Sequence, residues 1–151
     1  MNLITPLLQS ANVLADIETT SKKRLFEQVA QLFVSSHSLA APEVFDSLFA
    51  REKLGSTALG YGIAIPHGRI KHLKETACAF IRLKTPIEFD APDSQPVDLI
   101  FVLLAPAAAT DLHLQILGEL AAMFSDEAFR AQLRAVADAE ALHQLIVEWT
   151  P

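Results

Sequence analysis

A continuously apolar run between two prolines constrains the fold more than any other feature of this sequence. Apart from Asp98, residues 97–104 are all apolar, and Pro96 and Pro106 bracket them. Such a run is typical of a central strand that is covered on both faces, because a strand with one face in water alternates apolar and polar residues. The run therefore predicts a β-sheet with helices on both sides.

Two helices are predicted before this run. Apolar residues recur at helical spacing from Ser21, which can cap the helix, to about residue 36. Pro42 opens a second helix that ends near residues 51–54, because proline suits the first turn of a helix. This second helix ends just before a glycine-rich stretch that begins at Gly55.

A second strand is expected over residues 77–83, where small and aliphatic residues alternate with larger ones and Pro86 follows as a stop. This strand contains Cys78, the one cysteine of the chain. A single cysteine cannot form an internal disulfide or a cysteine-based metal site. Because its neighbours are apolar, we interpret Cys78 as a buried thiol.

Three more helices are expected in the last third of the chain, each preceded by a residue that can cap a helix. They cover residues 111–124 after Thr110, 126 to about 136 after Ser125, and 139–149 after Asp138. The first two carry acidic residues in their first turns, which suits the positive end of the helix dipole.

Length and composition predict a single domain over residues 1–151. A chain of 151 residues buries about two thirds of its unfolded surface. With 51% hydrophobic and 20% charged residues, it does not have the composition of a disordered chain. No repeat or linker marks a domain boundary.

Net charge and hydropathy argue against two classes of protein, namely nucleic-acid binders and membrane-spanning proteins. The formal charge of −6 argues against a nucleic-acid partner, because phosphate backbones are bound by clustered basic residues. Residues 22–24 are basic, but we interpret them as the solvated start of a helix. The longest apolar run, residues 99–109, is too short to cross a membrane, and the N-terminus lacks a signal-like pattern. We therefore expect a cytoplasmic protein with no membrane insertion.

Most of the histidines predict nothing unusual. His37 lies at a helix end and His143 on the polar side of the last helix, so both fit ordinary surface or core positions. His72 follows His67 by five residues, yet no third ligand and no metalloprotease motif accompany the pair. We expect neither a metal nor another cofactor.

His67 is different because it lies between Pro66 and Gly68, in a stretch that we expect to be a surface loop. The glycines around it have the spacing of neither a P-loop nor a dinucleotide fingerprint. Backbone amides after such a turn can bind an anion, and Arg51 and Arg69 can add positive charge. Neutral imidazole is also a competent nucleophile towards phosphorus. A phosphate ligand and a transient phosphohistidine are therefore predicted.

His113 lies in the first turn of an expected helix, where the positive end of the dipole keeps the ring neutral. Its helical neighbours Leu117, Leu120 and Phe124 place it on the core-facing stripe. Spacing alone leaves two interpretations open. The ring either takes part in a site with His67 or only closes the edge of the core.

Two motifs resemble the signature of enzyme IIA domains of the bacterial phosphotransferase system, in the mannitol, fructose and nitrogen class. They are residues 51–57, REKLGST, and residues 60–68, GYGIAIPHG. The likeness continues through residues 85–90, 95–99 and the helix start at 111–114, so it covers nearly the whole chain. It is greatest to the nitrogen-regulatory branch. One departure is Tyr61, where that branch often has a small polar residue, and this puts loop shape in doubt.

The resemblance implies an α/β fold in which a mixed β-sheet is sandwiched between helices on both faces. It also implies that His67 accepts a phosphoryl group, that His113 orients this group, and that Arg51 stabilises its charge. The backbone at Gly68 and Arg69 would contribute further phosphate contacts. The expected partners are a histidine phosphocarrier protein of the HPr or NPr type and unidentified regulatory targets.

Three functions remain open at this point. The leading hypothesis is a phosphotransferase that carries a phosphohistidine without hydrolysing it and acts as a regulatory switch in the nitrogen-related system. The first alternative is a sugar-specific IIA component that passes phosphate to a separate IIB protein. The second, from another class, is an interaction module in which His67 is never modified.

Overall fold

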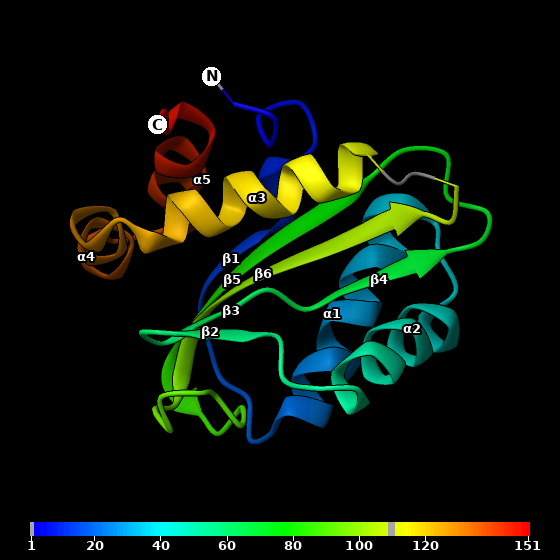
Figure 1. The fold of residues 1–151 in the computed structure, drawn as a ribbon, viewed down its shortest axis with the longest axis horizontal. Helices are drawn as coiled ribbons and strands as arrows, with labels where there is room; N and C mark the ends of the chain where they lie inside the picture. The colour runs from blue at the N-terminus through cyan, green and yellow to red at the C-terminus, as the bar shows by residue number, and fades with distance from the viewer. Residues whose placement is uncertain (1, 109–110) are drawn as a thin grey trace.

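The apolar run forms strand β6 (Val97–Pro106), which lies at the centre of a mixed, six-stranded sheet in the computed structural model (Figure 1). The structure describes residues 2–108 and 111–151. β6 pairs antiparallel with one neighbouring strand and parallel with two others. These are β5 (Ala77–Ile87), β3 (Ile63–Ala64) and β4 (His67–Ile70). The outer strands are β1 (Val13–Ile17), parallel to β5, and β2 (Ala58–Gly60), antiparallel to β3.

Helices cover both faces of this sheet (Figure 1). One face carries α1 (Lys22–His37) and α2 (Ala41–Lys53). The other face carries α3 (Asp111–Ser125), α4 (Glu127–Ala135) and α5 (Ala139–Glu148), while a short 3₁₀ turn, Ser10–Asn12, precedes β1. The expected α/β sandwich with a mixed sheet is therefore confirmed. In the part of the chain that the structure describes, no helix has the length and apolar character needed to cross a membrane.

β6 contributes to two separate apolar cores. Val102 and Leu104 belong to the core beneath α1 and α2, whereas Phe101 and Leu103 belong to the core beneath α3, α4 and α5. All four side chains are fully buried. Because successive side chains of a strand point to opposite faces, a strand between two helical layers has to be apolar at every position. This explains the unbroken run. Cys78 is buried in the second core, as expected.

Helix caps agree with the sequence pattern at two of the described helix starts. Ser21 accepts a hydrogen bond from the Arg24 amide at 3.1 Å, and Asp138 accepts one from the Ala141 amide at 2.9 Å. The cap of α4 was predicted wrongly. Asp126, rather than Ser125, accepts from the Phe129 amide, because α3 continues through Ser125. The expected cap Thr110 lies outside the described residues.

Three other expectations require correction. Pro86 does not stop β5, because it lies in an irregular part of the pairing with β6, where the missing N–H breaks no regular ladder bond. His67 is not in a loop but begins β4, where it pairs with Leu103. Lys22 is not a solvated helix start, since its side chain is only 17% exposed and forms an ion pair with Glu52.

Candidate functional site

A pocket of about 580 Å³ opens where α2, β4 and the start of α3 meet. It contains every residue that the sequence predicted for the site. The lining residues are Ser47, Ala50, Arg51, Leu54, His67, Gly68, Arg69, His113, Leu114 and Leu117. The fold therefore brings together three segments that are far apart in the sequence.

The His67 ring, at the start of β4, is held by a hydrogen bond to the backbone of Ile65. The Nδ1–H of the ring donates to the Ile65 carbonyl oxygen at 2.8 Å, and because a carbonyl can only accept, the proton must lie on Nδ1. Burial lowers the pKa of His67, and the Arg51 charge lowers it further, while the Ile65 bond and Glu52 act in the opposite direction. The neutral ring therefore presents an unprotonated Nε2.

His113 lies beside His67 on the first turn of α3. The ring centroids are 5.8 Å apart and the ring planes are inclined by 54°. Only 6% of His113 is exposed, and burial, followed by the charges of His67 and Arg69, lowers its pKa. The ring both faces the pocket and borders the core, so the two interpretations from the sequence are compatible.

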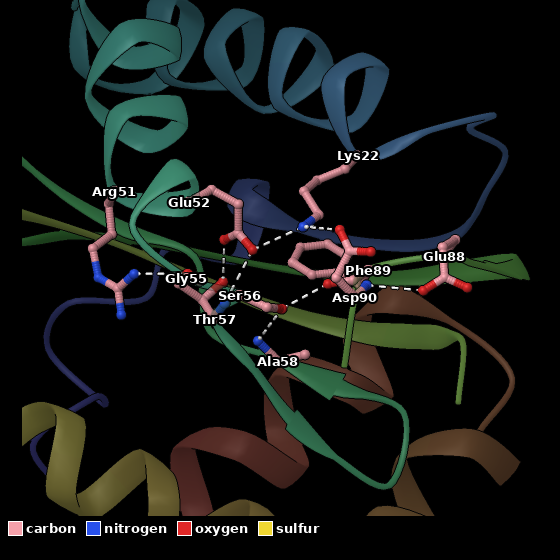
Figure 2. A network of polar contacts seen from close by, with 10 residues as sticks. All are labelled: Lys22, Arg51, Glu52, Gly55, Ser56, Thr57, Ala58, Glu88, Phe89 and Asp90. Atoms are coloured by element: carbon pink, nitrogen blue, oxygen red, sulfur yellow. Dashed lines mark hydrogen bonds and ion pairs between the residues drawn. The ribbon is translucent and has the colours of Figure 1, made fainter. Parts of the chain in front are cut away.

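Arg51 lies in the last turn of α2 and borders the same pocket. Its Nη1 donates to the Gly55 carbonyl oxygen at 2.8 Å (Figure 2). The neighbouring Glu52 carboxylate binds Lys22 and Thr57 instead of Arg51. The guanidinium is therefore a positive charge at the edge of the pocket.

Gly68 is needed for a reason that the sequence did not reveal. A Cβ at this position would collide with Ser47 Oγ and approach the Ser47 carbonyl carbon to 3.2 Å. Ser47 Oγ donates to the Arg69 carbonyl oxygen at 2.9 Å, which joins α2 to β4 directly beside His67. Nothing in the sequence pattern singled out Ser47, since a helical serine has no distinguishing spacing.

Arg69 contributes a second positive charge. Its Nη1 donates to the Ala107 carbonyl oxygen at 3.0 Å, so the side chain is anchored beside the start of α3. The rim of the pocket is apolar by contrast, with Leu54 85% exposed and Leu114 66% exposed. Among residues 2–108 and 111–151, no group of three side chains could hold a metal ion.

The pocket thus combines a nucleophile with a place for an anion. Nε2 of His67 is unprotonated, and two guanidinium groups border the space around it. Such an arrangement suits the transfer of a phosphoryl group to nitrogen, in which catalysis consists mainly of positioning and charge stabilisation. The exposed leucines at the rim suit contact with another protein rather than with a small polar molecule.

Comparison with known families assigns this fold and pocket to one class of protein. Residues 6–149 match the family described as phosphoenolpyruvate-dependent sugar phosphotransferase system, EIIA 2. The chain therefore belongs to this family of phosphotransferase domains.

Its curated relatives include several nitrogen regulatory proteins. The chain is 44% identical over 143 residues to that of Pseudomonas aeruginosa, an alignment covering 94% of this chain and 93% of the relative. For the Escherichia coli K12 protein the identity is 43% over 133 residues, covering 87% and 82%. The crystal structure of IIA-Ntr from Neisseria meningitidis matches with a TM-score of 0.92 at 48% identity, covering 96% and 99%. The resemblance to the nitrogen-regulatory branch is confirmed.

Proposed function

We propose that this chain is a cytoplasmic phosphohistidine carrier of the nitrogen-related phosphotransferase system. It accepts a phosphoryl group on Nε2 of His67 from a phosphocarrier protein of the HPr or NPr type, and its two phosphorylation states act as a regulatory switch. The observation that carries this proposal is the bond from His67 Nδ1–H to the Ile65 carbonyl, which leaves Nε2 free to attack. The nitrogen regulatory relatives support the regulatory role.

The chemical step is a direct transfer between two imidazole rings. The Nε2 lone pair of His67 attacks phosphorus, the P–N bond to the donor histidine breaks, and its electron pair returns to the donor ring. The Nδ1 proton of His67 remains on its bond to the Ile65 carbonyl oxygen, 2.8 Å away. This bond stabilises the positive charge that the ring gains as the new P–N bond forms.

Charge balance comes chiefly from the guanidinium groups of Arg51 and Arg69. The backbone at Gly68 and Arg69, which was also expected to contact phosphate, belongs to β4 and pairs with β6. A phosphoryl group carries negative charge on three oxygens, and planar guanidinium groups match that geometry. The His113 ring lies beside His67, with the ring centroids 5.8 Å apart, where it can orient one of these oxygens.

The transfer assay that tests this proposal uses phosphoenolpyruvate, an enzyme I-like kinase and the phosphocarrier. We expect acid-labile phosphoryl uptake by the wild type and none by His67→Ala, with an unchanged circular dichroism spectrum. The matched control is His72→Ala, since His72 is exposed and does not line the pocket. Uptake by His67→Ala would overturn the assignment of the acceptor, and absence of uptake in the wild type would favour the unmodified interaction module.

A second assay separates the regulatory carrier from a sugar-specific IIA component, the alternative raised by the family description. The phosphorylated chain is mixed with a sugar-specific IIB protein and, separately, with buffer. We expect the phosphoryl group to remain on the chain at the same rate of loss in both. Rapid transfer to the IIB protein would favour the transport function.

A further inference from the structure

The carboxylate of Glu52 is buried at the end of α2, directly after Arg51 (Figure 2). Only 4% of its side chain is exposed. Oε2 accepts from the Thr57 amide at 3.0 Å and from Lys22 Nζ at 2.9 Å, and Oε1 accepts from the Thr57 hydroxyl at 2.6 Å. Both carboxylate oxygens are therefore occupied, and the loop after α2 is tied back to the helix at Thr57.

Lys22, the first residue of α1, binds this carboxylate. Its ammonium group lies 4.5 Å from the centre of the Phe89 ring and 3.5 Å from Asp90 Oδ2 (Figure 2). The first residue of α1 thus closes over Glu52 and shields it from water. A buried ion pair of this kind contributes little net stability, because desolvation of both charges offsets their attraction. Another role for the pair is therefore worth seeking.

A continuous path of hydrogen bonds leads from Glu52 to the reactive ring. Glu52 binds the Thr57 amide, and the Thr57 carbonyl oxygen accepts from the Ile65 amide at 3.0 Å. The Ile65 carbonyl oxygen then accepts from His67 Nδ1–H at 2.8 Å. Successive hydrogen bonds in this path are joined through a single residue, first Thr57 and then Ile65. A shift of Thr57 therefore moves the Ile65 carbonyl oxygen, which accepts the Nδ1 proton of His67.

We infer that Glu52 is a positioning residue for the phosphoryl acceptor. By holding Thr57, it holds the Ile65 carbonyl in the place where His67 keeps its proton on Nδ1 and offers Nε2 to the donor. The inference rests on the proposed function of His67 as acceptor. Glu52 itself does not line the pocket and touches no transferred atom. Arg51 therefore borders the pocket, whereas Glu52, the next residue, holds the loop that follows α2.

The variants are chosen to separate the hydrogen bonds from the charge. Glu52→Met fills the same space and removes both carboxylate oxygens that bind Thr57 and Lys22. Lys22→Met combined with Glu52→Met also removes the ammonium that has lost its Glu52 partner, so this double variant stays folded if the single one does not. Glu52→Gln can keep the path, because the amide oxygen accepts from the Thr57 amide and the amide nitrogen donates to the Thr57 hydroxyl, which can also accept.

A matched control loses another partly buried ion pair that is remote from the pocket. Asp16 accepts from Arg82 Nη2 at 3.1 Å, and only 8% of the Arg82 side chain is exposed. Asp16→Ala therefore removes the carboxylate partner of a largely buried cation, as Glu52→Met does, but it touches no member of the path to His67. Asp16→Ala therefore shows what a loss of stability alone does to the tautomer of His67.

The experiment reads the tautomer of His67 by nitrogen NMR with isotope-labelled histidine, together with the single-turnover rate of phosphoryl uptake. We expect the wild type and Asp16→Ala to keep the proton on Nδ1. Glu52→Met and the double variant should show both tautomers and about tenfold slower uptake, and Glu52→Gln should restore most of both.

A wild-type tautomer and rate in both methionine variants would overturn the inference. So would the same tautomer change in Asp16→Ala, because the effect would then follow from stability alone. If the wild type takes up no phosphoryl group, the proposed function fails. The tautomer populations still decide the role of Glu52 in that case, since they are measured on the unphosphorylated chain.

Discussion

The rings of His67 and His113 lie beside one another in the pocket, with centroids 5.8 Å apart and planes inclined by 54°. The pKa of each ring is lowered, first by burial, so each ring is a neutral imidazole and neither repels the other as a cation. On the proposed function the pair enters the reaction uncharged, and we expect Arg51 and Arg69 to meet the negative charge of an arriving phosphoryl group.

The pH dependence of His67 follows from this arrangement. Its pKa lies below the ordinary value of about 6.5, so the neutral ring should persist down to that pH and titrate only below it. The fold favours the neutral form, so this contribution to stability is present above the unfolded pKa and is lost as the pH falls through the window between the two values. An NMR titration of His67 checks the midpoint, and a midpoint above 6.5 would contradict the expectation.

His113→Ala should lower both stability and transfer. Loss of the buried ring should destabilise the fold by about 1–2 kcal/mol, and loss of an orienting group should also slow phosphoryl uptake by about tenfold. Thermal unfolding and uptake are measured on the same preparation. His143→Ala is the control, because that ring bonds the Leu8 carbonyl oxygen and lies outside the pocket. An unchanged uptake rate in His113→Ala would leave His113 with a purely structural role.

Arg51→Ala should slow phosphoryl uptake without removing the acceptor. A hydrogen bond to a charged group contributes about 1.5–3 kcal/mol, which corresponds to roughly a ten- to hundredfold loss of rate. Arg51→Lys should recover part of the rate, because an ammonium supplies charge but not the planar, two-pronged contact. Rapid-quench measurements compare the three proteins, and equal rates would exclude Arg51 from the site.

Gly68→Ala should destabilise the fold by about 1–3 kcal/mol, because the new methyl group collides with Ser47 Oγ. Ser47→Ala alone should cost about 1 kcal/mol through its lost bond to the Arg69 carbonyl oxygen. The double variant should be destabilised by less than the sum of the two single variants, since loss of the Ser47 hydroxyl relieves the collision. Gly118→Ala serves as control and should stabilise α3 by about 0.5–1 kcal/mol, because no atom lies near its Cβ. Denaturant unfolding of the wild type and all four variants checks this, and additive costs in the double variant would contradict it.

The sequence predicted the elements whose patterns are local. The apolar run of β6, all five helices and the motif residues of the pocket followed from spacing, caps and resemblance. The short strands did not. β1, β3 and β4 gain their structure from pairing with distant strands, and β2, which is three residues long, pairs with β3. His67, for instance, becomes part of a strand only through its pairing with Leu103.

Ser47 and Glu52, which hold the site in place, could not be predicted for the same reason. Ser47 matters because α2 packs on β4, and Glu52 matters because Lys22 arrives from another helix. Neither contact leaves a pattern within its own segment. Residues that contact a ligand tend to carry a motif, whereas the residues behind them are identified by tertiary geometry.

The most direct test of the central claim is phosphorus–nitrogen correlated NMR of the phosphorylated chain, with isotope-labelled histidine. The Ile65 carbonyl occupies Nδ1 of His67, so we predict that phosphorus is bonded to Nε2 of His67 and to no other nitrogen. Mass spectrometry of fragments assigns the same modification to the peptide that contains Pro66 and Gly68. A phosphoryl group on Nδ1 of His67, or on His113, would contradict the account.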